Sequence, residues 1–115
     1  MSDQLLARLR QFVNDRDWEQ FHDPKNLSMA LAAEVGELLA CFRWLTPPES
    51  EDILRHEETS KRVLEELGDV AICLMMLCDR LGVSIEEVAS EKLALNEARY
   101  PVDRARGRAT KYSDL

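Results

Sequence analysis

The sequence is short of helix-breaking residues and of the patterns that mark exported or membrane proteins. Four glycines and four prolines in 115 residues argue against a collagen-like or disordered chain and favour helix. The longest apolar run, Val70 to Cys78, is too short to span a bilayer, and no charged start followed by an apolar segment opens the chain. We therefore expect a soluble, unexported protein that does not contact membranes.

Cysteine and basic residues are scarce as well. Cys41, Cys73 and Cys78 are an odd number without CxxC spacing and fall in apolar helical segments, which predicts reduced, buried thiols and a cytoplasmic location. The 15 Lys and Arg against 22 Asp and Glu give a net charge of -7, which disfavours binding to nucleic acid. Any phosphate that the protein handles therefore needs bridging cations.

The spacing of apolar residues predicts an all-α fold, a bundle of four to five helices that forms one domain over residues 1–115. We expect these segments in order: a helix over 2–16, an ordered loop over 17–25, a helix to about residue 45, an acidic connector over 46–56, helices over 57–81 and 84–100, and a basic tail over 102–115 that is mobile or docked on a partner.

Capping residues indicate where these helices begin and end. Asn26 or Ser28 can cap the second helix, and Gly82 is placed to close the third as a left-handed cap. Ser84, three residues before Glu87, opens the fourth helix, which ends at Tyr100 because a proline follows.

The run from Val70 to Cys78 is apolar on every face of the third helix. A domain of this size has a thin core and cannot cover such a helix on all sides. A subunit interface would cover it, so we expect a homo-oligomer, a dimer or a tetramer.

Two short segments repeat one pattern of charge. Residues 34–37 (Glu-Val-Gly-Glu) and 66–69 (Glu-Leu-Gly-Asp) each place two carboxylates at i and i+3, with a glycine just before the second. Glycine within a helix costs about 1 kcal/mol relative to alanine, so we expect close approach of the two helices to explain Gly36 and Gly68. Glu34 also interrupts an apolar stripe and is expected to face inward.

Four inward carboxylates that met would repel one another and take up protons unless cations lay between them. Oxygen-only ligands select magnesium, with manganese as a substitute, over zinc. Solvated faces of charged helices explain most single carboxylate pairs, but two matched pairs with matched glycines favour a metal site.

Three further features fit a nucleotide and also have plainer interpretations. Trp44 is seven residues beyond the second carboxylate of the first motif, about 10 Å further along the same helix face; a base can stack there, although the spacing alone favours a core tryptophan. Lys92, Asn96 and Arg99 form a polar stripe that either contacts phosphate or is simply solvated. His22 lies in an aromatic loop and either lines a pocket or has no special role.

Several sequence blocks occur in an order that is typical of one family: residues 16–22, 26–27, 34–37, 42–44, 65–70, 92–96, 99–101, 106–107 and 111–115. With these blocks, the sequence resembles the MazG-like all-α nucleoside triphosphate pyrophosphohydrolases over nearly the whole chain, and most closely their dCTP pyrophosphatase branch. Family members of this length form dimers of dimers with composite sites.

The resemblance implies hydrolysis of a (deoxy)nucleoside triphosphate, dCTP or a modified pyrimidine relative, to the monophosphate and pyrophosphate. It implies that magnesium is held by Glu34, Glu37, Glu66 and Asp69, and Glu34 or Glu37 would orient the attacking water. It further implies a nucleotide site lined by His22 and Trp44 at the base and completed by Asn26, Lys92, Asn96 and Tyr100.

Two other functions stay open at this point. A phosphoribosyl-ATP pyrophosphohydrolase is a related enzyme, although the loop from Trp18 to His22 resembles the dCTP branch instead. A helical interaction module without enzymatic activity would need no divalent ion, so a metal titration separates it from both enzymes.

Overall fold

The computed structural model describes residues 3–115. Within this range the chain is helical or connecting, without a strand, so the all-α prediction is confirmed. Ser2, the expected start of the first helix, lies outside the described residues. The chain divides into two compact units, Met1–Gly82 and Val83–Leu115, and the expected single domain over 1–115 stays a prediction.

The first unit contains, in order, α1 (Asp3–Asp15), the 3-10 helix η1 (Glu19–Phe21), α2 (Pro24–Phe42), α3 (Pro47–Glu51), η2 (Ile53–Arg55) and α4 (Glu57–Leu81). The second unit contains α5 (Ile85–Arg99), α6 (Val102–Ala105) and the 3-10 helix η3 (Tyr112–Asp114).

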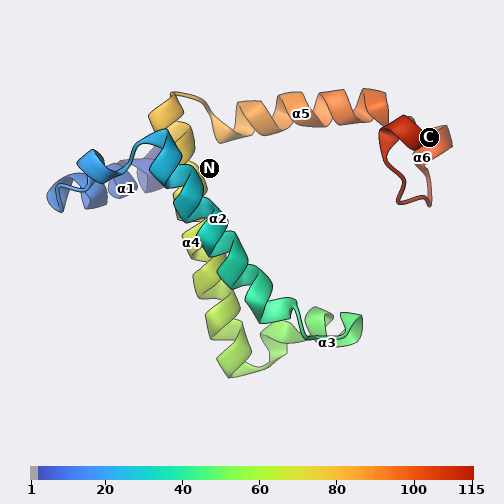
Figure 1. Cartoon of the computed structure of the whole chain (residues 1–115), viewed down its shortest axis with the longest axis horizontal. Helices are drawn as coiled ribbons and strands as arrows, with labels where there is room; N and C mark the ends of the chain where they lie inside the picture. Colours follow the sequence, from blue (N-terminus) through green and yellow to red (C-terminus); the bar gives the residue numbers. More distant parts are fainter. Residues whose placement is uncertain (1–2) are drawn as a thin grey trace. The chain divides into compact units, whose positions relative to one another are not determined.

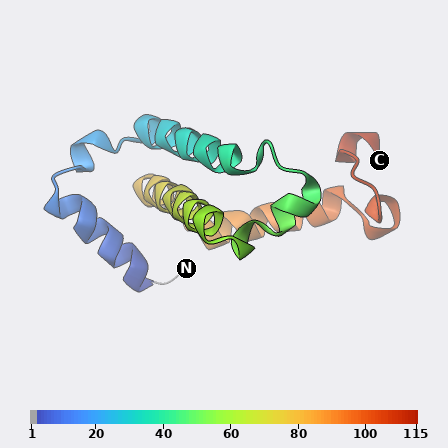
Figure 2. The same ribbon diagram turned by 90° about the horizontal axis from the view of Figure 1, so that it is seen from below.

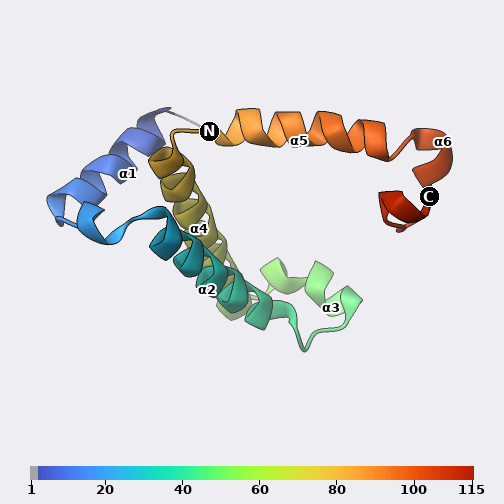
Figure 3. The ribbon, with the colours of Figure 1, turned by 45° about the horizontal axis from the view of Figure 1, so that its top comes forward.

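The two long helices α2 and α4 form the frame of the first unit. They run antiparallel and lie side by side in both views (Figure 1, Figure 2). The helix α1 packs against α4 (Figure 3). The buried apolar side chains of the described residues come from α1, α2, η2 and α4: Leu9, Val13, Leu27, Ile53, Val63, Cys73 and Met75. This small core sets α2 against α4, the two helices that carry the carboxylate motifs.

The predicted ends of α4 and the predicted start of α5 are confirmed. Gly82 closes α4 with φ of 70°, a left-handed conformation that glycine adopts without steric cost. The hydroxyl of Ser84 caps α5 by accepting the backbone N–H of Glu87 at 3.3 Å. Both signals are local, which is why the sequence predicts them well.

The predicted ends of α2 are wrong at both sides. Its cap is Asp23, whose carboxylate accepts the backbone N–H of Asn26 at 2.8 Å. Pro24 occupies the first turn, where the missing N–H costs nothing. The helix ends at Phe42 instead of Leu45, and residues 43–45 form a turn.

The acidic connector contains two short helices, α3 and η2, which the sequence analysis did not predict. Thr46 and Glu49 form a capping box that opens α3, with the backbone N–H of Thr46 donating to Glu49 at 2.9 Å. The two prolines after Thr46 fit the first turn of this short helix, whereas the sequence analysis used them only as a stop for α2.

The apolar run of α4 is only partly covered within the described chain. Cys73 and Met75 are buried, whereas Ile72 and Leu74 remain 41% and 38% exposed. The three cysteines are free, but only Cys73 is buried. Among residues 3–115, no helix is long and apolar enough to cross a membrane.

The tail folds against its own unit, and its expected mobility or docking on a partner stays a prediction. It forms α6 and η3, and the ring of Tyr112 meets that of Tyr100 edge to face at 6.0 Å. Tyr112 lies 13 positions beyond the end of α5 at Arg99, and at that separation it gives no periodic signal that would predict this contact.

Candidate functional site

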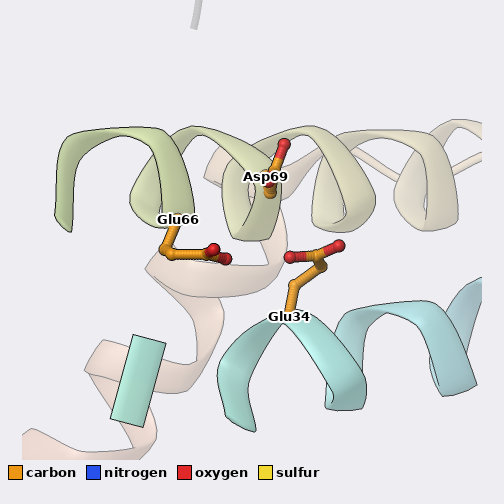
Figure 4. A group of neighbouring side chains, drawn as sticks. All are labelled: Glu34, Glu66 and Asp69. Atoms are coloured by element: carbon orange, nitrogen blue, oxygen red, sulfur yellow. The ribbon is translucent and has the colours of Figure 1, made fainter. Parts of the chain in front are cut away.

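Three carboxylates from α2 and α4 meet between the helices. Glu34 comes from α2, and Glu66 and Asp69 come from adjacent turns of α4; one oxygen of each lies within 4.8 Å of the others. Figure 4 shows Glu34 reaching from α2 toward the carboxylate of Glu66. The antiparallel packing of the two helices brings the two motifs together, as the sequence analysis predicts for these three residues.

The electrostatics of the cluster are unfavourable without a cation. Burial raises the pKa of Glu66. Glu34 raises this pKa further through a side-chain hydrogen bond and through its negative charge, and the charges of Asp69 and Glu37 make smaller contributions. The Oε2 atom of Glu66 is buried and has no hydrogen-bond partner. A proton shared with Glu34 would supply such a partner, and so would a cation.

The cluster fits a divalent metal ion. Its three candidate ligands are carboxylates, hard oxygen donors of the kind that magnesium, manganese and calcium take. A cation placed among them would neutralise their mutual repulsion and would satisfy the unpartnered Oε2 atom of Glu66. The prediction of an acidic metal site between the two motifs is therefore supported at the level of a divalent ion.

Glu37 lies outside this group of three. Its side chain is exposed, as is that of Asp69, whereas Glu34 and Glu66 are half-buried. Of the four carboxylates expected to face inward, Glu37 and Asp69 are exposed, although an oxygen of Asp69 still lies close to those of Glu34 and Glu66. Residues three apart on a helix differ in direction by about 60°, which puts the second carboxylate of each motif at the rim. Glu37 as a fourth ligand stays a prediction.

The matched glycines are not explained by close packing of α2 on α4. A Cβ atom at Gly36 or Gly68 would meet nothing within 4 Å. Both positions have room for a side chain in the chain as described, so the expected close approach is wrong. Nothing within the chain explains the choice of glycine there.

Trp44 is an exposed side chain just beyond the end of α2. It is 82% exposed, and the guanidinium of Arg43 lies 4.5 Å from its ring centroid. A core tryptophan is therefore excluded. Because α2 ends at Phe42, Trp44 does not share a continuous helix with the carboxylates of the first motif. Arg43 lies over one face of the ring, and most of the side chain is exposed to solvent.

His22 lines an open pocket at the other end of α2. The pocket is formed by α1, η1, the start of α2 and the last turns of α4, and its lining is Leu9, Arg10, Val13, Glu19, His22, Leu27, Met76, Asp79 and Arg80. The ring of His22 lies 6.4 Å from that of Trp18, edge to face. The pocket thus has an apolar floor and a charged rim.

Asn26 holds the turn that precedes α2. Its side-chain amide donates to the carbonyl of Phe21 at 3.2 Å and to the carboxylate of Asp23 at 3.1 Å. These bonds fix the backbone next to His22. A role in contacting substrate stays a prediction, and within the chain the amide group has structural partners.

His22 and Trp44 flank opposite ends of α2. The helix has 19 residues, which corresponds to a length of about 28 Å. A single chain therefore does not bring these two residues to the same base. A pocket that contains both needs a second copy of the chain.

The remaining predicted residues belong to the second unit. Lys92 and Asn96 lie on α5, and Tyr100 caps its C-terminal end by donating its backbone N–H to the carbonyl of Asn96. Positions 92, 96 and 99 follow one helix face, as their spacing predicts. Their part in a nucleotide site stays a prediction.

The sequence analysis missed an ion pair between α1 and α4. Nε of Arg10 donates to Oδ2 of Asp79 at 3.1 Å, and a second guanidinium nitrogen donates to Oδ1. The Arg10 hydrogen bond holds the pKa of Asp79 below its usual value. The pair forms part of the wall of the His22 pocket. The partners are 69 positions apart, so no local pattern signals their contact.

Comparison with known proteins decides the family. Residues 29–115 match the sequence profile of the MazG-like family. The chain belongs to this family. The match covers the carboxylates of α2 and α4, Trp44 and the second unit. His22 and Asn26 precede the matched range.

Individual MazG-like relatives agree with this result. The chain is 42% identical over 105 residues to dCTP pyrophosphatase 1 of Rattus norvegicus, which covers 91% of the chain and 62% of the relative. It is 40% identical over the same length to dCTP pyrophosphatase 1 of Homo sapiens. The chain thus spans about 62% of the length of these curated relatives.

The fold also matches a solved structure. A pyrophosphatase from Archaeoglobus fulgidus superposes with a TM-score of 0.80 at 37% sequence identity, over 86% of this chain and 91% of the archaeal one. The MazG-like resemblance and the all-α fold expected from the sequence are therefore both confirmed.

Proposed function

We propose that the chain is a magnesium-dependent nucleotide pyrophosphohydrolase that cleaves a deoxynucleoside triphosphate, dCTP or a modified pyrimidine relative, to the monophosphate and pyrophosphate. The observation that carries the proposal is the cluster of Glu34, Glu66 and Asp69 in a chain of the MazG-like family. The substrate class follows from the relatives, which are named dCTP pyrophosphatase 1.

The metal ligands of this proposal are Glu34, Glu66 and Asp69, with Glu37 at the rim as a fourth. A bound magnesium ion, or manganese as a substitute, would neutralise phosphate charge and lower the pKa of a coordinated water. The raised pKa of Glu66 means that protons compete with a cation for this carboxylate more strongly than for an ordinary glutamate.

The reaction needs a group that orients water and accepts its proton. Glu34 or Glu37 takes this role, and the water oxygen forms a bond to the α-phosphorus while the bond to the bridging oxygen of pyrophosphate breaks. Lys92 and Asn96 contact the phosphates and stabilise the charge that builds on their oxygens. Tyr100 and Asn26 complete the nucleotide site.

The base contacts His22 and Trp44. The exposed ring of Trp44 stacks on the base, and the pocket beside His22 supplies polar groups that distinguish one base edge from another. Because the two residues lie at opposite ends of α2, the proposal requires that each base be enclosed by residues of more than one copy.

A homo-oligomer, a dimer or a tetramer, meets this requirement. Exposed apolar side chains on both units offer the surface for it, among them Leu39, Leu67, Ile72, Leu74, Leu93 and Leu95. Monomeric soluble proteins seldom expose so many large apolar residues. The proposal places the enzyme in the cytoplasm and gives it no nucleic-acid or membrane partner.

A substrate panel tests the proposal. The purified chain is incubated with each of the canonical dNTPs, 5-methyl-dCTP and phosphoribosyl-ATP in magnesium, and the products are separated by ion-exchange chromatography. We expect monophosphate and pyrophosphate from pyrimidine triphosphates, and His22→Ala should narrow the preference for dCTP. Preferential cleavage of phosphoribosyl-ATP would assign the related enzyme class instead, and no cleavage of any substrate would support a non-enzymatic module.

A further inference from the structure

The C-terminal end of α5 and the tail form a small cluster of rings around one arginine. Cζ of Arg99 lies 4.6 Å from the ring centroid of Tyr112, and the rings of Tyr100 and Tyr112 are nearly perpendicular, at 85°. After α6 the tail turns back toward the end of α5 (Figure 3). The ring of Tyr112 therefore contacts the planar face of the Arg99 guanidinium.

This arrangement leaves the hydrogen-bonding edge of Arg99 available. A guanidinium that stacks on a ring uses its π face, while its five N–H donors remain in the plane and match the oxygens of a phosphate. Among residues 3–115, no carboxylate forms an ion pair with Arg99 and no side chain or carbonyl accepts a hydrogen bond from it. The ring of Tyr112 thus orients the guanidinium of Arg99, whose N–H donors have no described hydrogen-bond acceptor.

The surrounding charge favours an anion. Segment 98–112 carries five basic residues, Arg99, Arg104, Arg106, Arg108 and Lys111, against one acidic residue, Asp103, in a chain with net charge -7. The face of α5 that ends at Arg99 also presents Lys92 and Asn96. Positive charge in this acidic protein is therefore concentrated around the docked tail.

A plainer role for Arg99 is to stabilise the end of α5. A cation in the last turn of a helix interacts favourably with the helix dipole. That role needs charge alone, however, and is fulfilled without an aromatic ring beneath the guanidinium. The ring contact specifies orientation, which matters for recognition of an oxyanion and not for a dipole.

We propose that Arg99 binds a phosphate oxygen of the triphosphate substrate and that Tyr112 of the tail is the residue that positions it. The identity of the ligand rests on the proposed function; the site itself rests on the contacts among Arg99, Tyr100 and Tyr112. The tail is then part of the nucleotide site, because its docking sets the direction in which the guanidinium donates.

Binding measurements without turnover test this proposal. Two probes, the non-hydrolysable analogue α,β-imido-dCTP and inorganic tripolyphosphate, are titrated calorimetrically in magnesium into wild type, Arg99→Gln, Tyr112→Phe and Tyr112→Leu. Arg108→Gln, which removes a tail arginine with no ring contact, serves as the matched control. Thermal melting and light scattering of each variant report folding and assembly.

We expect Arg99→Gln and Tyr112→Leu to weaken both probes by about tenfold to a hundredfold, the value of a charge-assisted hydrogen bond. Tyr112→Phe keeps the ring and should bind within about twofold of wild type, as should Arg108→Gln. Trp44→Ala should weaken the analogue but not tripolyphosphate, which has no base. This contrast separates phosphate recognition from base recognition.

The proposal would be overturned if Arg99→Gln bound both probes as tightly as wild type. A lower melting temperature of this variant would not rescue the proposal, because unchanged binding with reduced stability is what a helix-dipole role of Arg99 predicts. A loss in Tyr112→Phe as large as in Tyr112→Leu would overturn the positioning role of the ring. The proposed function fails separately: it fails if wild type cleaves no triphosphate, whatever the effect of Arg99→Gln on tripolyphosphate binding.

Discussion

Replacement of Trp44 by alanine should weaken nucleotide binding with little effect on folding. The side chain is 82% exposed, and substitutions at exposed sites usually change the free energy of unfolding by less than about 0.5 kcal/mol. Its only described ring contact is with the guanidinium of Arg43, at 4.5 Å. Any large loss of affinity in Trp44→Ala therefore comes from contacts made with the ligand.

The size of the loss follows from stacking. A base on an aromatic side chain is worth about 1 to 3 kcal/mol by alanine substitution, which corresponds to an increase in Kd of about 5- to 150-fold. Because every base has a π face, Trp44→Ala should raise Kd by similar factors for pyrimidine and purine triphosphates. Trp44→Phe should recover most of the affinity.

Calorimetric titration with α,β-imido-dCTP in magnesium measures this effect. Arg43→Gln is the matched control, since it removes the cation from the ring but keeps the stacking surface, and light scattering shows whether the assembly is unchanged. If Trp44→Ala bound the analogue as tightly as wild type, or if Arg43→Gln lost as much affinity as Trp44→Ala, the assignment of Trp44 as a stacking surface would be refuted.

Three further predictions concern the cluster, the ion pair and the assembly. Glu66→Gln should lower turnover by at least about 100-fold. Because the pKa of Glu66 is raised in the folded state, the melting temperature of the metal-free wild type should fall as pH rises through that pKa. The Glu66→Gln variant should lack this decline and melt at a higher temperature. Equal pH profiles of the two melting temperatures would contradict the electrostatic account. Arg10 lowers the pKa of Asp79, so the stabilisation is present above the ordinary pKa and lost as pH falls through the folded value; Asp79→Asn should remove this acid dependence, as melting curves between pH 2 and 6 will show. Leu74→Glu should dissociate the oligomer in light scattering, and a wild type that is monomeric at micromolar concentration would contradict the composite site.

Local signals made α4 and the start of α5 predictable. Gly82 and Ser84 act on residues within one turn of themselves, so their effect is visible in a short stretch of sequence. Asp23 and Pro24 are equally local, but proline both breaks helices and starts them, and the sequence alone did not decide between the two. The end of α2 was misplaced because Leu45 continues the apolar spacing into a turn.

The sequence predicted those features of the candidate site that depend on the direction of a side chain from its helix. It missed contacts that depend on how distant segments of the chain pack together. The apolar stripe that Glu34 interrupts predicted that this side chain faces inward, where it meets Glu66. Side chains from distant segments meet only through tertiary packing, so the contact of Arg10 with Asp79 has no counterpart in sequence spacing. The contact of Arg99 with Tyr112 depends in the same way on how the tail folds back.

The separation of His22 from Trp44 shows most clearly what cannot be predicted from the sequence of a single chain. Both residues fit a base pocket by type, but a helix of 19 residues lies between them. In the proposed composite site, the copy that supplies each residue depends on the assembly, and neither helix periodicity nor capping carries that information.

The most direct test of the central claim is a magnesium titration of pyrophosphate release from dCTP, run in parallel for wild type, Glu34→Gln and Glu66→Gln. The account predicts no release in excess EDTA, saturable release by wild type as magnesium is added, and at most a trace from either variant at the concentration that saturates wild type. Release that is independent of magnesium, or wild-type turnover by both variants, would contradict the assignment of this carboxylate cluster as the metal site of a nucleotide pyrophosphohydrolase.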